Sequence, residues 1–403
     1  MNAQPIEKEK IETIKKEMNS EFRDHMIPFW KCMRDEENGG YYGLLDADLK
    51  LDKKGVKGCI LNSRIMWFFS NAYLTLGDES MLEYAEHSYR FFEKAFWDSE
   101  EGGVYWSVTA DGKPLDETKH TYCQAFQIYG LSSYYAVSKD ETAINRAYQL
   151  FRIIEDRCRD RDGYLEAFDR KFVPASNEKL SENGVMAVRT MNTLLHVMEA
   201  YTELYRVLTD DKRRDAVKSK LTEILDIFRC KIFDPSKERL EVFFDKDYDS
   251  LIDLHSFGHD IEAAWLIDRT VDVLEYKGTE HDMADITEVL TGKIYECAYD
   301  GRSVPAESEC GKVLQDRIWW VECESVIGFL NGYNRDNSKA YYLDATYKVW
   351  EFIKAYMVDK RDGSEWYWGV DPDGKPLKDK EFVSPWKCPY HNGRMFFEVL
   401  RRV

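Results

Sequence analysis

The feature that most constrains this fold is a short segment of glycine and aromatic residues that recurs six times along the chain. It occupies residues 39–43, 102–106, 163–168, 239–244, 301–304 and 363–368. Successive segments start 63, 61, 76, 62 and 62 residues apart. Self-similarity at a nearly fixed period is the signature of a repeat architecture. We therefore expect one structure of six related units, although 403 residues would otherwise favour two or three domains of about 150 residues each.

Each recurrence is expected to form a short β-hairpin. The residues around it alternate aromatic and polar side chains and then reach a tight turn. The two best-matched copies, 106–115 and 368–377, both end in Asp-Gly-Lys-Pro-Leu. Asp-Gly after an alternating strand is a strong hairpin signal.

Between the hairpins the apolar residues follow a helical period. One apolar face combines Ile65, Phe68, Phe69, Ala72 and Leu76, and after a polar turn at 77–80 a second helix continues to about residue 96. Such spacing predicts amphipathic helices separated by a turn. The same pair is predicted at about 120–137 and 141–157, 186–208 and 211–231, 257–275 and 279–298, and 317–333 and 338–358. A helix at about 8–33, with a break expected at Pro28, and one at about 391–401 bring the number to twelve.

Twelve helices with one hairpin per pair predict an all-α fold, the (α/α)6 barrel, as a single domain over residues 1–403. The hairpins would lie together on one rim of this toroid. An open solenoid is the alternative. Closure is favoured because both end helices carry apolar faces without a polar capping unit, so the first and last helices should pair to close the ring.

Charge and composition exclude several classes of binding partner. The net charge is −18, and no long run of Lys or Arg supplies the basic footprint that nucleic acids and anionic membranes require. Residues 1–16 lack the apolar core of a signal peptide, and no apolar run approaches the ~20 residues of a membrane span. Nine cysteines without a CxxC pair favour reduced thiols and a cytoplasmic location. The 14% aromatic content fits either a large core or a carbohydrate pocket.

Two clusters of polar residues are the candidate functional segments. Residues 254–265 contain His255, His259 and Glu262, which would share one face of a helix because residues three and four apart are neighbours there. Residues 385–394 contain Trp386 and His391. We expect the two segments to face each other across one pocket.

Polar or aromatic residues follow every hairpin, close to the predicted start of the next helix. In chain order they are Arg64, His120, Tyr122, Asn192, His196, His259, Glu262, Trp319, Trp320, Glu324, Trp386 and His391. If the hairpins share one rim, these groups converge on one end of a central funnel. Of the adjacent Trp319 and Trp320, one is expected to face inward and the other to lie in the core.

Several chemistries remain open for this funnel. His255 and His259 could form a structural pair, or bind a metal, although HExxH and a further ligand motif are absent. Dinucleotide, phosphate-loop and nucleophile-elbow motifs are also absent. Glycoside hydrolysis would need two carboxylates, such as Glu262 and Glu324. The abundance of histidine favours proton transfer at a carbon beside a carbonyl, because the histidine pKa of about 6.5 allows both uptake and release. Arg64 and Asn192 could hold the enediolate oxygen.

Short segments over nearly the whole chain match a known family. They are residues 27–30, 62–68, 119–122, 180–184, 190–196, 258–262, 319–324 and 386–394. In these segments the chain resembles the N-acylglucosamine 2-epimerase superfamily and, within it, the bacterial cellobiose 2-epimerases. The resemblance implies an (α/α)6 barrel and no metal or nucleotide cofactor.

The resemblance also implies an activity and residue roles. The expected reaction is reversible epimerisation at C2 of the reducing-end glucose of β-1,4-linked disaccharides, through ring opening and a cis-enediolate. By position, the acid/base pair would be His259 and His391. The substrate-binding residues would be Arg64 and Asn192 at O1 and O2, His196 and Glu262 in support, with Glu262 orienting His259, and Tyr122, Trp320 and Trp386 at the sugar, to which we add Glu324.

The expected partners are small molecules: cellobiose, lactose and cello-oligosaccharides. The chain is expected to be a monomer or a weak homodimer. Three other functions remain open on the same barrel. One is a monosaccharide epimerase or aldose–ketose isomerase acting on N-acylglucosamine or mannose. The second is a glycoside hydrolase that uses Glu262 and Glu324, and the third is a non-catalytic sugar-binding or protein-binding toroid.

Overall fold

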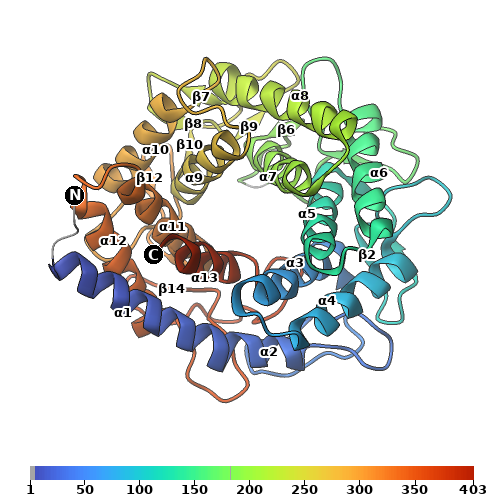
Figure 1. The fold of residues 1–403 in the computed structure, drawn as a ribbon, viewed down its shortest axis with the longest axis horizontal. Helices are drawn as coiled ribbons and strands as arrows, with labels where there is room; N and C mark the ends of the chain where they lie inside the picture. Colours follow the sequence, from blue (N-terminus) through green and yellow to red (C-terminus); the bar gives the residue numbers. More distant parts are fainter. Residues whose placement is uncertain (1–4, 182) are drawn as a thin grey trace.

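The computed structural model describes residues 5–181 and 183–403, and its helices form two concentric rings (Figure 1). Residues 1–4 and Glu182, which belongs to the matching segment 180–184, lie outside this description. The inner ring contains α3 (Cys59–Leu76), α5 (Thr121–Ser138), α7 (Met191–Val207), α9 (Phe257–Val273), α11 (Trp319–Arg335) and α13 (His391–Arg402). The outer ring contains α1 (Pro5–Glu21), α2 (Ile27–Cys32), α4 (Ser80–Phe91), α6 (Glu141–Arg157), α8 (Asp211–Ile227), α10 (Ala284–Cys297) and α12 (Ala340–Phe352).

The expected break at Pro28 does not occur. The helices α1 and α2 are joined without interruption by a π-helical turn, η1 (Phe22–Met26). Proline cannot donate the backbone hydrogen bond that an α-helix needs, and the wider turn immediately before it keeps the helix continuous. Counted as one helix, α1 and α2 bring the described helices to the predicted twelve. Similar turns, η2 (Phe92–Phe96), η3 (Phe228–Ile232) and η4 (Ile353–Met357), end three of the outer helices.

The inner helices are buried on all sides, whereas the outer helices are buried on one face. In α3 every residue from Cys59 to Ala72 is buried, and in α5 every residue from Thr121 to Tyr135. The outer helix α6 buries only one stripe: Ala143, Ile144, Ala147, Leu150, Phe151 and Ile154. A helix surrounded on all sides lies inside, whereas an amphipathic helix covers the outside.

The ring is closed. Each inner helix contacts the next, α13 returns to contact α3, and α1 packs against α12 and α13. The first and last helices, α1 and α13, therefore contact each other, and Figure 1 shows the ring closed at this point. The prediction of a closed toroid of six helix pairs is confirmed, because the apolar faces of the first and last helices cover one another.

Short strands gather at the end of the barrel where the inner helices begin. Five antiparallel pairs join successive units: β1 (Lys57–Gly58) with β2 (Ser107–Val108), β4 (Lys119–His120) with β5 (Ala167–Phe168), β6 (Arg189–Thr190) with β9 (Phe243–Phe244), β10 (Leu254–Ser256) with β11 (Glu307–Glu309), and β13 (Arg317–Ile318) with β14 (Gly369–Val370). A bridge between Leu45 and Val383 joins the sixth unit to the first. The remaining strands pair within a unit: β3 (Pro114–Asp116) with β2, β12 (Lys312–Val313) with β11, and β7 (Phe233–Asp234) with β8 (Arg239–Leu240). The hairpins lie on one rim, as predicted, but most strand pairing joins neighbouring units.

One backbone hydrogen bond recurs at the start of five inner helices. The first residue of the helix donates its N–H to a carbonyl of the next unit: Cys59 to Trp106, Thr121 to Glu166, Met191 to Val242, Phe257 to Ala306 and Trp319 to Trp368, all at 2.9–3.0 Å. Donors at a helix start have no partner within the helix. These bonds hold the inner helices at the same height, so that residues at equal helix positions surround the same level of the barrel.

The recurring sequence segment has a physical origin in the turn after each outer helix. An aspartate at each turn accepts a backbone N–H two residues ahead; the six are Asp35, Asp98, Asp160, Asp234, Asp300 and Asp359. Aspartate favours turns because its side chain bonds its own backbone in this way.

All nine cysteines are free thiols. Within residues 5–181 and 183–403, no helix combines the length and apolar character needed to cross a membrane.

Candidate active site

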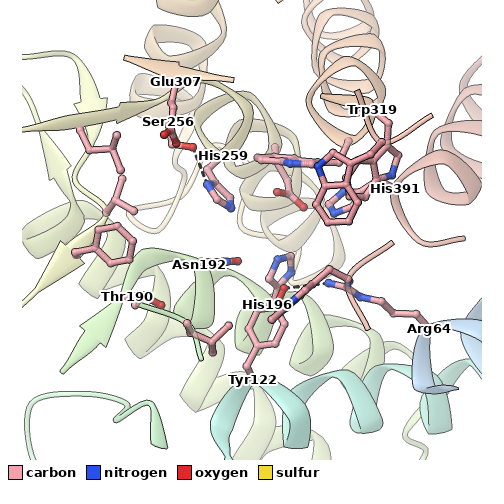
Figure 2. Close-up of a pocket in the computed structure, with 18 residues that line it drawn as sticks. Arg64, Tyr122, Thr190, Asn192, His196, Ser256, His259, Glu307, Trp319 and His391 are labelled. Carbon is pink, nitrogen blue, oxygen red and sulfur yellow. Dashed lines mark hydrogen bonds between the residues drawn. The ribbon is translucent and has the colours of Figure 1, made fainter. Parts of the chain in front are cut away.

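A cavity opens at the rim where the inner helices begin, and all six inner helices contribute to its wall. Nine of the ten predicted site residues line it: Arg64, Tyr122, Asn192, His196, His259, Glu262, Trp320, Trp386 and His391. The tenth, Glu324, is fully buried behind the wall. Figure 2 shows the histidines at 196, 259 and 391 around one space. The sequence clusters 254–265 and 385–394 therefore face a common pocket, as expected.

The barrel's repeat places equivalent residues around one level. The sixth residue of four inner helices is Arg64 in α3, His196 in α7, Glu262 in α9 and Glu324 in α11. Side chains of a helix lean toward its N-terminus, so these groups point toward the rim with the cavity. The N-terminal ends of the inner helices carry partial positive charge at the same place, which favours negative charge in the cavity.

His391 is held by a carboxylate. Its Nδ1 lies 2.8 Å from Oε1 of Glu324, whose other oxygen accepts from Trp265 Nε1 at 3.0 Å. An ionised carboxylate can only accept, so Nδ1 carries the proton and Nε2 is left with its lone pair. Burial lowers the pKa of His391 well below its usual range, Glu262 opposes this shift, and Arg394 adds to it. Burial raises the pKa of Glu324.

His259 is held by a hydroxyl group. Its Nδ1 lies 2.7 Å from Oγ of Ser256, and its ring packs on Trp320 with centroids 4.8 Å apart. Burial lowers the pKa of His259 to about 4, although the carboxylate of Glu262 opposes the shift. At neutral pH both His259 and His391 are therefore uncharged bases.

Glu262 was expected to orient His259, but no hydrogen bond joins these two side chains among the described residues. One of its oxygens accepts from Arg394, and the other, Oε2, is buried without a hydrogen-bond partner in the described residues. The expectation that His255 shares a helix face with His259 is wrong. His255 lies in β10, before the helix begins, and its Nε2 bonds Asp260 at 2.8 Å.

Arg64 brings an unpaired positive charge to the cavity. It is 2% exposed, donates to Tyr122 Oη at 3.0 Å, and contacts Cys388 Sγ at 3.6 Å. Its guanidinium lies over the rings of Phe126 and Tyr390, at 4.0 and 4.3 Å from their centroids. Among the described residues its hydrogen-bond partners are these uncharged groups, so an oxyanion in the cavity could pair with it.

His196 and Asn192 complete the α7 side. His196 Nδ1 lies 3.1 Å from Glu199 Oε2, and its ring meets Tyr122 edge to face at 5.2 Å. Burial opposes ionisation of Glu199, but Arg394 and His196 lower its pKa below the usual range. Asn192 Oδ1 is buried without a hydrogen-bond partner in the part of the chain described. It can therefore accept from a substrate hydroxyl.

Arg394 lies beneath the cavity and joins its carboxylates. It is 1% exposed, bonds Glu199 and Glu324 at 2.7 Å each, and also bonds Glu262 and Tyr390. Ligand atoms of Glu262, Glu324 and His391 lie within 4.8 Å of one another, a spacing that could hold a metal ion. Arg394 already donates to both carboxylates of this group, so its guanidinium neutralises the charge that a metal ion would need.

Aromatic side chains form the remaining wall. Trp386 meets Trp106 and Tyr122 at centroid distances of 5.9 and 6.1 Å. Trp319 belongs to the buried core, as expected of one of the two tryptophans, at 3% exposure. Both Trp319 and Trp320 nevertheless line the cavity. Trp319 is the first residue of α11 and packs beside Trp368 at the mouth, 4.7 Å between ring centroids.

The residues that line the cavity differ in part from those selected in the sequence. His120 packs behind Trp106, 4.7 Å between centroids, and is not part of the cavity wall. The wall also includes residues that the sequence analysis did not single out, of which Leu254 and Ser256 fall within the candidate segment 254–265: Leu180, Thr190, Val242, Phe243, Leu254, Ser256, Glu307 and Trp368. Most of these lie on or beside rim strands. Their approach depends on strand pairing between units, for which the sequence holds no local signal.

Comparisons with known proteins agree over almost the whole length. The N-acylglucosamine 2-epimerase (GlcNAc 2-epimerase) family matches residues 39–392. The chain is 48% identical over 390 residues to a cellobiose 2-epimerase from Eubacterium cellulosolvens, covering 94% of this chain and 96% of that protein. It is 47% identical over 386 residues to one from Ruminococcus albus, covering 96% and 98%. The crystal structure of a sugar epimerase from a ruminal bacterium matches with a TM-score of 0.94 at 46% identity, covering 96% of this chain and 99% of that chain.

Proposed function

The chain belongs to the N-acylglucosamine 2-epimerase family, and from this we propose that it epimerises the reducing-end glucose of β-1,4-linked disaccharides at C2, reversibly. Cellobiose would give 4-O-β-D-glucosyl-D-mannose, and lactose would give epilactose. Relatives 48% and 47% identical over nearly the whole chain are cellobiose 2-epimerases, which supports this substrate class over free monosaccharides.

One observation carries the chemistry. Two imidazoles with lowered pKa values, His259 and His391, face the same cavity as the unpaired guanidinium of Arg64. A neutral imidazole can remove a proton from a carbon beside a carbonyl and return it. The guanidinium can stabilise the oxyanion that this removal creates. Each part of a proton-transfer epimerase therefore has a candidate residue.

The proposed reaction begins when the sugar ring opens and exposes the C1 aldehyde. One histidine removes the C2 proton, and the electron pair of the broken C–H bond moves toward the C1 oxygen to form a cis-enediolate. Arg64 and Asn192 hold the two oxygens. Rotation about C2–C3 then presents the other face, and the proton returns to C2 with inverted configuration. No external oxidant or reductant is needed, because the proton and the electron pair both return.

The roles of the other residues follow from their contacts. Glu324 bonds Nδ1 of His391, and Glu199 bonds Nδ1 of His196, so both carboxylates act through a histidine. Tyr122 and Trp320 would contact the reacting sugar. Trp386 would stack on the second, non-reacting sugar, because an aromatic face suits the C–H surface of a pyranose.

The test is proton NMR of cellobiose incubated with the purified protein in D2O. We expect a growing mannose-type anomeric signal with deuterium entering C2. His391→Ala should abolish this exchange, whereas His281→Ala, on a partly exposed histidine outside the cavity, should not. Unchanged cellobiose, or release of free glucose by hydrolysis, would contradict the proposal.

A further inference from the structure

Ser256 occupies a helix-capping position but does not cap the helix. It immediately precedes α9, and its side chain makes no capping hydrogen bond. A serine at this position normally accepts from a backbone N–H of the first turn. In α9 the N–H groups of Phe257 and Gly258 are directed to the carbonyl of Ala306 in the next unit. The hydroxyl of Ser256 instead lies 2.7 Å from Nδ1 of His259.

The same barrel contains a direct comparison. Thr190 precedes α7 as Ser256 precedes α9, and its hydroxyl accepts from the N–H of Thr193 in the usual capping geometry. The two hydroxyl residues occupy equivalent positions in neighbouring units, and only the one beside a cavity histidine is turned to that ring. Ser256 is itself 3% exposed and pairs with Glu307 in the β10–β11 ladder, so its backbone is held by the strand.

The two histidines therefore differ in what supports them. Glu324, when ionised, only accepts a hydrogen bond, and so it holds His391 with the proton on Nδ1. A serine hydroxyl both donates and accepts, and so it is compatible with the proton of His259 on either nitrogen. In both rings Nδ1 is occupied, which leaves Nε2 for the substrate.

We propose that Ser256 is a positioning residue that presents Nε2 of His259 to the substrate and supports either neutral tautomer of that ring. This inference rests on the proposed epimerase function. In the proposed reaction the histidine that takes the C2 proton becomes an imidazolium and later returns that proton, so its neutral form must offer the Nε2 lone pair. The Ser256 hydroxyl allows this form of His259 by accepting from Nδ1–H, and it also allows the form protonated on Nε2, which can donate a hydrogen bond to a sugar oxygen. Glu324, when ionised, keeps His391 in the first form.

The first test is nitrogen-15 NMR of the resting enzyme, and it needs no substrate. We expect the ring nitrogens of His391 to show a single Nδ1–H tautomer and those of His259 to show a mixture. Ser256→Ala should shift the His259 signals and leave those of His391 in place. A single tautomer of His259 in the wild type, or His259 signals unchanged in Ser256→Ala, would overturn the proposal. Because this measurement is independent of turnover, it separates the positioning role from the assigned reaction.

The second test is kinetic. Ser256→Ala should lower kcat on cellobiose by about tenfold, the order expected for one lost hydrogen bond, with KM changed by less than about threefold. Ser256→Thr keeps the hydroxyl and should restore kcat to within about threefold of wild type. Asp210→Ala removes a cap that accepts from Arg213 N–H on the outer helix α8, and it should leave kcat unchanged. Unchanged kcat in Ser256→Ala, or no recovery in Ser256→Thr, would count against Ser256.

Discussion

Nδ1 of His391 lies 2.8 Å from Oε1 of Glu324, a residue on a different inner helix. The carboxylate is fully buried and reaches the cavity only through the imidazole. It can therefore fix the orientation of His391 and stabilise the imidazolium that forms when Nε2 takes a proton. We therefore propose that Glu324 positions His391, whereas the sequence had indicated a substrate-binding role for it.

We predict that Glu324→Gln lowers kcat for cellobiose epimerisation by about 100-fold, a loss within the range for a positioned acid/base, with little change in KM. An amide of the same shape keeps the packing but cannot stabilise the imidazolium by charge. Glu288→Gln, on an exposed face of α10, is the matched control and should behave as wild type. Steady-state rates on cellobiose provide the measurement, and a tenfold increase in KM at unchanged kcat would instead place Glu324 at the substrate.

The pH dependence should reflect the burial of the two histidines. Burial lowers the pKa of His259 to about 4 and that of His391 well below its usual range. Since protonation removes the base, kcat/KM should stay level from pH 8 through 6.5 and fall only as the pH approaches about 4. The unfolded chain takes up these protons near pH 6.5, so folding stability should also decline as the pH falls from about 6.5 toward 4. Initial rates and thermal unfolding across this range check both statements, and a half-maximal rate at pH 6.5 would contradict them.

Arg64→Met should lower kcat by about 100- to 1000-fold, the loss expected when one oxyanion-stabilising donor is removed. The folding cost should be small, because Arg64 lies between the rings of Phe126 and Tyr390 and no carboxylate of the described residues pairs with it. Deuterium exchange at C2 measures the chemical step, and urea unfolding measures stability. A variant that retains exchange would remove Arg64 from the proposed mechanism.

Arg394→Met, unlike Arg64→Met, should lower the free energy of unfolding strongly. It removes the buried cation that Glu199, Glu262 and Glu324 share, and breaking a buried ion pair costs about 3–5 kcal/mol. Arg90→Met breaks an exposed pair with Glu86 and should cost about 1 kcal/mol or less. Urea unfolding of both variants tests the difference, which would vanish if Arg394 were dispensable to folding.

The sequence was sufficient for the architecture because its signals are local. Turn-forming glycines and helical apolar periods act over a few residues, and their sixfold recurrence predicted twelve helices in a closed ring. The sequence also indicated which polar residues lie near a helix start: Arg64, Asn192 and His259 were selected because they follow a hairpin. Once the inner helices are held at one height by the rim hydrogen bonds, such residues must converge.

The contacts behind the cavity could not be predicted in the same way. Arg394 bonds Glu262 across 132 residues of sequence, and that approach exists only because the ring closes. Ser256 looked like an ordinary helix cap, but its hydroxyl lies 2.7 Å from Nδ1 of His259, and the first two N–H groups of α9 are directed to Ala306 of the next unit. His255 fitted the helical spacing, but the strand pairing of β10 begins the helix two residues later. Local periodicity in the sequence sets which residues reach the rim. Which of these residues contact one another depends on the packing between units, because hydrogen-bond partners within about 3 Å are fixed by that packing rather than by spacing along the chain.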